Sequence, residues 1–279
     1  MSQRIFTLTG YLFRRLAFSL TGLLYVLAAL AYWRVFFSPT EGRTPEADLF
    51  ILMIGLFGLA LTFLVTLSVA NRANHAAGYP ILVRLPSRVE YLIAVMSASL
   101  LFALLLQAVM ALVVLAQPDG PDVSFGRLLE VPPIWLSADI FVSVLALHAT
   151  DLVMKNWSRV QIYGILAGLL FSQSVSAGTL NWVAARLRRL GNVYFVAGRD
   201  ELGDRLHNIA SWLSVNGVIF LKNTLGLVFW PFTAISDAVK AGAFTNAQAF
   251  APTILLLYAT ILFMLAADLF ATKDLHLVE

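Results

Sequence analysis

Four ionisable side chains fall within or beside long apolar runs of the sequence, where a charge is costly. Asp139, His148 and Asp151 share one run, and Asp268 lies near the end of another. A carboxylate at bilayer depth costs about 2.5–3.5 kcal/mol on insertion scales, so each should face protein, water or the membrane interface. Asp139 follows Pro133 by only about one and a half helical turns. We therefore favour an interfacial carboxylate near the outer boundary, with a role in a transport pathway as the alternative.

A proton relay between Asp139 and His148 is not expected. The two residues are nine positions apart, which corresponds to about 900° of rotation around a helix. Their side chains should therefore lie on opposite faces. Asp151 and Asp268 stand closer to the inner ends of their runs, and we interpret both as interfacial.

Small and polar residues gather in a third run. Gly164 and Gly168 are four residues apart, and Ser172 and Gln173 follow them. Small residues at this spacing let helices approach closely, and the hydroxyl and amide groups can hydrogen-bond across helices. This face suits a subunit interface or the lining of a pathway, and ordinary packing within the chain fits equally well.

Several kinds of catalytic chemistry lack the residues they need. There is no cysteine, which excludes disulfides, thiolate metal sites and a cysteine nucleophile. The four histidines fall in separate segments, without the paired spacing that zinc or haem requires. No Gly-Lys dipeptide occurs, so a Walker-type phosphate loop is absent and ATP-driven work would need a partner chain. We expect no cofactor, no metal and no enzymatic activity on this chain.

The composition indicates that the elements positioning these residues are membrane helices. Of 279 residues, 59% are apolar and 13% are charged, against about 45–50% and about 25% in soluble domains. The mean hydropathy is +0.81 and the net charge +3. Because the basic residues stand mainly beside apolar segments, they are better explained by membrane topology than by a nucleic-acid partner. We expect a single all-α transmembrane domain over residues 1–279.

Six apolar segments are long enough to cross a hydrocarbon core of about 30 Å. The first is too long for a signal peptide, so we expect it to be retained. Residues 1–15 alternate apolar with polar and basic side chains, which is typical of a helix lying in the headgroup plane, with a frayed terminus as the alternative. The six predicted spans cover residues 16–37, 49–70, 89–116, 134–154, 160–180 and 249–271.

The connecting segments differ in character. Residues 38–48 and 117–133 are rich in proline, glycine and acidic side chains, which predicts loops. Residues 181–248 begin with basic residues and become apolar from 209 to 235, with interruptions that include Gly217, Lys222 and Pro231. A lysine in mid-span would be costly. A broken or re-entrant helical segment on the outer side is therefore preferred to a seventh span.

Charge distribution predicts the orientation. With the amino terminus in the cytoplasm, only Arg43 and Arg127 fall in the short outer loops and Arg34 at their edge, among five or more acidic residues. Basic residues favour cytoplasmic loops, so both termini should be cytoplasmic. The inner segments hold Arg4, Arg14, Arg15, Arg72, Arg84, Arg88, Lys155, Arg159 and Lys273.

The segment between the second and third spans, residues 72–88, is the best candidate for contact with a soluble partner. We expect a cytoplasmic helix parallel to the membrane that ends in a proline turn. Its apolar side chains would dock into a groove on the partner, and its arginines would meet acidic groups or lipid headgroups. The predicted coupling surface consists of Arg72, Tyr79, Leu82, Arg84, Pro86 and Arg88.

Residues 78–93 resemble the signature that permeases of the type-2 ATP-binding cassette exporters carry between their second and third spans. The likeness rests on Leu82, on Leu85 with Pro86-Ser87-Arg88, and on Tyr91-Leu92 at the start of the third span. The closing stretch 266–275, with a basic residue before Asp274-Leu275, is similar to the usual ending of that family. The chain departs from the pattern at Asn74-His75, where an acid is common, and at Ala94-Val95, where Gly-Lys is common.

The resemblance implies a permease subunit in a bacterial-type inner membrane. ATP and Mg²⁺ would bind a separate ATPase subunit, and a second permease, identical or different, would complete the pathway. Asp139, Ser172 and Gln173 are then pathway candidates. The alternative is a structural or assembly subunit of a larger membrane complex that has the same fold without transporting anything.

Overall fold

The computed structural model describes residues 2–37, 46–73, 85, 87–117, 121, 123, 125–153, 177–241 and 245–272. Within these ranges the chain forms helices joined by short turns, and no strand occurs among them. This agrees with the predicted all-α fold. Contacts between residues divide the chain into two compact units, which are described separately.

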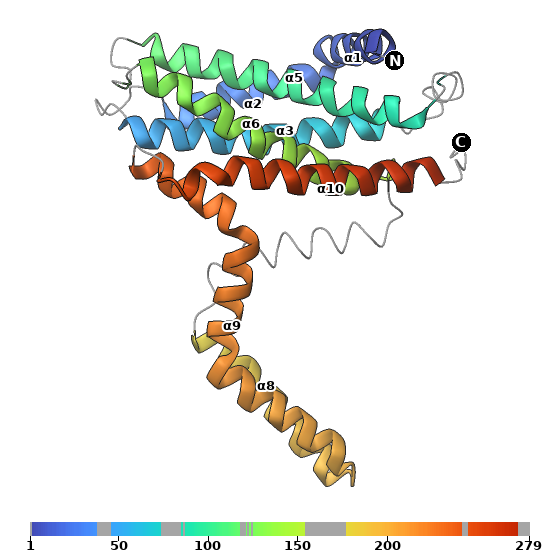
Figure 1. The fold of residues 1–279 in the computed structure, drawn as a ribbon, viewed down its shortest axis with the longest axis vertical. Helices are drawn as coiled ribbons and strands as arrows, with labels where there is room; N and C mark the ends of the chain where they lie inside the picture. The colour runs from blue at the N-terminus through green and yellow to red at the C-terminus, as the bar shows by residue number, and fades with distance from the viewer. Residues whose placement is uncertain are drawn as a thin grey trace. The chain divides into compact units, whose positions relative to one another are not determined.

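The first unit, here called the bundle, comprises Met1–Ile162 and Pro231–Glu279. Its long helices run side by side (Figure 1). The last part of α9, from Pro231 onward, also belongs to this unit and packs against α6 through Phe232 and Phe141, whose ring centroids are 5.3 Å apart. The helices of the bundle are α1 (Ser2–Ala17), α2 (Leu20–Phe36), α3 (Ala47–Ala73), α5 (Arg88–Leu115), α6 (Phe125–His148), η2 (Gln248–Phe250) and α10 (Ala251–Thr272).

Three described helices are long and apolar enough to cross a membrane, namely Ala47–Arg72, Arg88–Leu115 and Gln248–Thr272. The bent pair α1 and α2 gives a fourth if it is taken as one span, and Trp135–His148 is a shorter apolar helix. The described helices therefore agree with an all-α membrane protein and account for three or four spans. The predicted fifth span, residues 160–180, lies outside the described residues except for the first turn of α8.

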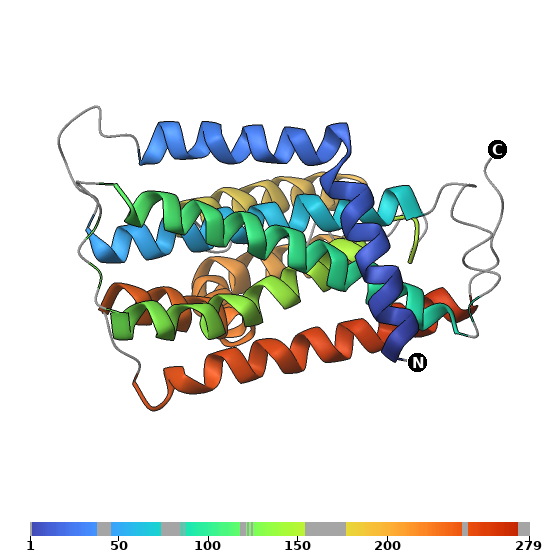
Figure 2. The ribbon, with the colours of Figure 1, turned by 90° about the horizontal axis from the view of Figure 1, so that it is seen from above.

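The helix predicted for residues 1–15 is present as α1, which ends at Ala17. It meets α2 at a bend of 68°, so that α1 runs obliquely across the long helices while α2 runs along them (Figure 2). Ser19 caps α2 by accepting a hydrogen bond from the Gly22 backbone N–H at 3.1 Å. A Cβ atom on Gly22 would overlap the Leu16 carbonyl oxygen, so the corner requires glycine there.

The direction of each helix in the bundle follows from its contacts. Tyr25 donates to the Leu64 carbonyl at 2.8 Å and Tyr32 to the Met53 carbonyl at 3.0 Å, which makes α2 antiparallel to α3. By contrast, α3 and α6 are parallel, because Thr62 contacts Asp139 and Thr66 contacts Ser143 one turn further along both helices.

One end of the bundle carries several arginines and is here called the basic end. Arg72, in the last turn of α3, hydrogen-bonds Thr21 at the start of α2. Arg88, the first residue of α5, donates to the carbonyl oxygens of Phe270 and Ala271 near the end of α10, both at 3.4 Å. The starts of α2 and α5 therefore lie beside the ends of α3 and α10.

The loop predicted for residues 117–133 is wrong in its second half, because α6 begins at Phe125 and contains Pro132 and Pro133. Proline removes a helical N–H and crowds the carbonyl four residues before it. Here the two lost hydrogen bonds fall in the second and third turns of a 24-residue helix. Because apolar residues stand on both sides of the two prolines, the helix continues through a stretch whose composition predicts a loop.

The second unit, Tyr163–Trp230, is here called the hairpin. It contains α8 (Ala177–Val196) and the part of α9 (Asp200–Ala241) before Pro231. The two helices are antiparallel, because Asn192 pairs with His207 at 3.0 Å and Arg188 with Ser214 at 3.3 Å. Gly198 adopts φ +69° in the turn between them, a conformation that glycine adopts with little strain.

The predicted break within residues 209–235 is not observed, because α9 is continuous from Asp200 to Ala241. Gly217 was expected to interrupt the helix. Instead its missing side chain leaves room for Leu180 of α8, which would lie 3.3 Å from an added Cβ. The glycine therefore serves helix packing, a use that a local breaker signal does not reveal. Pro231, inside α9, marks the boundary between the two units.

Candidate functional site

A line of buried polar side chains joins α3 to α6 and is here called the polar seam, defined as Thr62, Thr66, Asp139 and Ser143. The Thr62 hydroxyl donates to Asp139 Oδ1 at 3.1 Å, and the hydroxyls of Thr66 and Ser143 lie 3.1 Å apart. All four side chains are fully buried. Polar groups buried in this way must be paired within the protein, since water cannot reach them.

Glycines let large side chains fit beside the polar seam. Trp135 lies one turn before Asp139 on α6 and packs directly on Gly55 of α3, where a Cβ atom would overlap the indole ring. Gln107 of α5 similarly occupies the space beside Gly58 and donates to the Ile54 carbonyl at 3.1 Å. The three helices α3, α5 and α6 are therefore held in close contact around the seam.

The position of Asp139 corrects the interfacial interpretation. Its partner Thr62 stands near the middle of α3, which runs from Ala47 to Ala73. Asp139 therefore lies at mid-length of the bundle, and its exposed fraction is 0%. The prediction was wrong because it counted from Pro133, whereas α6 begins two turns earlier at Phe125.

The hydrogen bonding of Asp139 is incomplete. Its Oδ2 atom has no partner among the described residues, and neither has Nε1 of Trp135. One hydroxyl donor is insufficient to compensate a fully ionised carboxylate in a buried place. A group that bound here would therefore bring a positive charge or a hydrogen-bond donor.

His148 lies on the opposite face of α6, as the nine-residue spacing predicted. Its Nε2 atom is 2.9 Å from the Leu262 carbonyl of α10, whereas Asp139 faces α3. His148 therefore connects α6 to α10 and takes no part in the polar seam. Asp268 is exposed and Asp151 is partly exposed.

Only two members of the predicted coupling surface are described, and both make contacts at the basic end. Arg72 hydrogen-bonds Thr21, and Arg88 contacts the last turn of α10. Ser87 caps α5, with its side chain accepting from the Val89 N–H at 3.3 Å. The other members of the surface, Tyr79, Leu82, Arg84 and Pro86, lie outside the described residues, as do Gly164, Gly168, Ser172 and Gln173.

Glu90 is a buried residue that the sequence reasoning missed. It stands in the first turn of α5 with an exposed fraction of 5%, and its Oε2 atom has no partner among the described residues. An acid in a first helical turn is usually explained by the helix dipole. Glu90 differs from an ordinary acid in a first helical turn only in its burial beside Tyr91.

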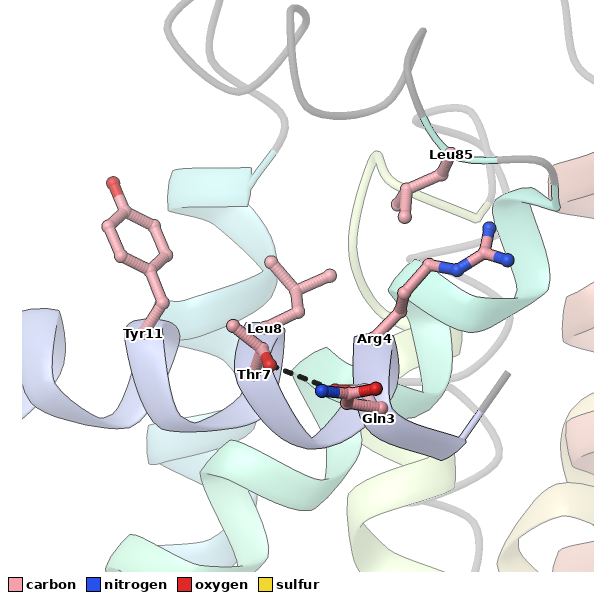
Figure 3. A pocket seen from close by; sticks show the side chains of 6 residues that line it. All are labelled: Gln3, Arg4, Thr7, Leu8, Tyr11 and Leu85. Atoms are coloured by element: carbon pink, nitrogen blue, oxygen red, sulfur yellow. Dashed lines mark hydrogen bonds between the residues drawn. The ribbon is translucent and has the colours of Figure 1, made fainter.

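Two hollows flank α1, and sequence reasoning did not anticipate either. The first has a volume of about 550 Å³ and is shown in Figure 3, lined by Gln3, Arg4, Thr7, Leu8, Tyr11 and Leu85. The second, of about 630 Å³, lies between α1 and α5 and is lined by Ser2, Ile5, Phe6, Thr9, Gly10, Phe13, Ser97, Leu101 and Leu105. The alternation of polar and apolar residues in α1 is the sequence feature from which these hollows could have been predicted.

Within the described part of the chain, no group of three or more His, Cys, Asp or Glu side chains could hold a metal ion. Comparison with family models, with curated proteins and with solved structures finds no match.

Proposed function

We propose that this chain is the permease subunit of a type-2 ATP-binding cassette exporter in a bacterial-type inner membrane. A separate ATPase subunit would bind and hydrolyse MgATP, and a second permease, identical or different, would complete the translocation pathway. The chain itself has no enzymatic role. The observation that carries this proposal is the anchoring of both ends of the 72–88 segment at the basic end of the bundle.

This anchoring provides a route for mechanical force. Arg72 connects the start of the segment to α2, and Arg88 connects its end to α10. The donor of each contact is a charged guanidinium group, and the Arg88 contacts are long, at 3.4 Å. When the ATPase closes on ATP and pushes on the segment, the displacement reaches α2 and α10 as well as α3 and α5. Four helices then move together.

The helix directions support six crossings. Because α6 is parallel to α3, both end at the basic end. The contacts of Phe141 with Tyr258 and of His148 with Leu262 make α10 parallel to α6, so α10 begins at the opposite end. The chain must therefore pass from one end to the other between Val153 and Ala251. The apolar run 160–180, predicted as the fifth span from its sequence, is our proposal for this crossing.

Charge supports a cytoplasmic basic end. Arg14, Arg15, Arg72 and Arg88 gather there, whereas the opposite end has Arg34 near the end of α2 and the acids Glu46 and Asp48 at the start of α3. An excess of arginine in short segments marks the cytoplasmic side. The 72–88 segment and both termini then face the compartment that holds ATP.

The polar seam supplies a position for transported groups inside this permease. Separation of α3 from α6 would expose Asp139 and the hydroxyls of Thr62, Thr66 and Ser143 at mid-length of the bundle. These groups attract cations and hydrogen-bond donors. Its buried position at mid-length of the bundle makes Asp139 a stronger pathway candidate than the interfacial position expected from the sequence would.

A second candidate is a non-transporting assembly subunit, which the surface of the hairpin favours. Trp182, Trp212 and Val196 are exposed there by 61%, 45% and 91%. Large exposed apolar side chains are common at contacts between proteins. Under this reading the chain would hold other subunits together through the hairpin and have no ATPase partner.

The test is ATP hydrolysis by the assembly that an affinity-tagged chain retains after mild solubilisation of its native membranes. Arg84→Glu should lower the retained activity by about tenfold or more, because it reverses a charge at the proposed contact. Arg84 is preferable to Arg88, whose substitution would also disturb α10. The matched control is Arg189→Glu on the hairpin, which should retain the activity.

A wild-type assembly without ATPase activity would contradict the permease proposal. So would equal activity in the Arg84→Glu and wild-type assemblies. Loss of associated subunits on Arg189→Glu alone would support the assembly subunit instead.

A further inference from the structure

Helix α1, Ser2–Ala17, has two chemically different faces. Arg4, Arg14 and Arg15 lie on one face with Gln3, Thr7 and Tyr11, and all six are exposed. Ile5, Phe6 and Phe13 lie on the other face. Leu8, Leu12 and Leu16 are buried and fix the helix to the bundle. No acidic residue occurs between Ser2 and Ala17, so the polar face is uniformly basic.

The polar face borders an open hollow beside Arg4. Figure 3 shows the Arg4 side chain reaching along the pocket toward Leu85, with Tyr11 at the other side and Leu8 at the base. Thr7 and Gln3 complete the wall, and the Thr7 hydroxyl donates to the Gln3 carbonyl at 2.9 Å. The Arg4 guanidinium can bind the oxygens of a phosphate through two parallel N–H groups.

The apolar face borders a groove of about 630 Å³ against α5. Leu101 and Leu105 form its α5 side and are exposed by 53% and 51%, while Phe6 on α1 is exposed by 81%. Thr9 lines the groove too, and its buried hydroxyl has no partner among the described residues. A hydrocarbon chain lying in the groove would cover the leucines.

The two hollows flank the first turn of α1, where Ser2 lines the groove and Gln3 and Arg4 line the pocket. We propose that together they bind one anionic phospholipid, with its phosphate at Arg4 and an acyl chain in the α1–α5 groove. The basic face supplies the charge complementarity, and the unpaired backbone N–H groups of the first helical turn add to it. This inference does not depend on an ATPase partner.

The experiment measures lipid retention by the full chain in detergent, using native mass spectrometry with phosphatidylglycerol, phosphatidylcholine or inorganic phosphate added. The wild-type chain should retain phosphatidylglycerol in preference to phosphatidylcholine. Arg4→Gln should reduce that preference by about fivefold, the effect of one basic side chain on an anionic lipid. The matched control is Arg189→Gln on the hairpin, which should leave the preference unchanged.

A second variant tests the groove. Gly10 lines it, and a Cβ atom added there would meet nothing within 4 Å, so Gly10→Leu fills the groove without a backbone clash. It should reduce retention of both lipids. Ser97→Phe fills the same groove from α5 and provides an independent result if Gly10→Leu fails to fold, as judged by circular dichroism.

Three outcomes would overturn the proposal. The first is equal retention of phosphatidylglycerol and phosphatidylcholine by the wild-type chain. The second is unchanged retention in both groove variants. The third is complete displacement of phosphatidylglycerol by inorganic phosphate, which would show a free-anion site that makes no use of the groove. Because the assay contains no ATPase, failure here leaves the exporter proposal untouched.

Discussion

In the polar seam of the bundle, side chains are buried and bonded to one another across helices, whereas the hydrogen-bonded polar pairs of the hairpin lie at the surface. Thr62 and Asp139 meet inside the bundle with both side chains fully buried. In the hairpin, the ion pair of Arg205 with Glu201 is 2.6 Å long, yet the two side chains are 70% and 81% exposed. The exposed contact of the hairpin is therefore shorter than the buried contact of the bundle, 2.6 Å against 3.1 Å.

A polar contact contributes most to stability where it is buried. A buried donor or acceptor that loses its partner cannot turn to water, so its loss costs the full desolvation penalty. An exposed group is solvated again at once. Side-chain contacts in the bundle should therefore be sensitive to substitution and those of the hairpin tolerant, although both units are helical.

The largest effect is expected from Gly55→Leu in the bundle. The new side chain would have to occupy the volume of the Trp135 ring, which is itself buried. Overpacking of this kind costs about 3 kcal/mol of unfolding free energy, at the upper end of its usual range. Equilibrium unfolding in mixed detergent, followed by circular dichroism, measures it. Asn208→Leu, at an exposed position of the hairpin, is the control and should change the free energy by less than about 0.5 kcal/mol.

An intermediate effect is expected from Thr62→Val, which preserves the shape of the side chain and removes the donor to Asp139. Leaving that oxygen without a partner should cost about 1–3 kcal/mol. Thr62→Ser keeps the hydroxyl and should recover most of the loss. In the hairpin, Ser214→Ala removes an exposed contact with Arg188 and should have a smaller effect. A loss of unfolding free energy as large as that of Thr62→Val would contradict the expected difference between the two units.

The smallest effect is expected from Glu201→Gln, which removes the charge that pairs with Arg205. Exposed pairs at this spacing contribute less than about 0.5 kcal/mol. Melting curves at low and high salt measure the effect, and the small difference between variant and wild type should vanish at high salt. A large difference that persists in salt would show that the hairpin has a buried surface in the intact protein.

Local pattern was enough to predict most of the helices. The alternation in residues 1–15 predicted α1, and the apolar runs 49–70, 89–116 and 249–271 predicted α3, α5 and α10 to within a few residues. The opposite orientation of Asp139 and His148 also followed from helical geometry alone. These features depend on residues close together in sequence.

Long-range packing determined what could not be predicted. No periodicity relates Thr62 to Asp139, which are 77 residues apart, so the depth of Asp139 in the bundle was misjudged. Gly217 was misjudged for the same reason. It was predicted to interrupt a helix, whereas its missing side chain leaves room for Leu180 of the neighbouring helix. The partner of each residue had to be known before its role could be assigned.

The corner at Gly22 also has a consequence for motion. Ser19 caps α2, and the Leu16 carbonyl oxygen occupies the place that a side chain on Gly22 would take. Because this corner is tightly packed, α1 and α2 should move together. Because the two helices meet at a bend of 68°, a sideways displacement of α1 should rotate α2 about its own axis.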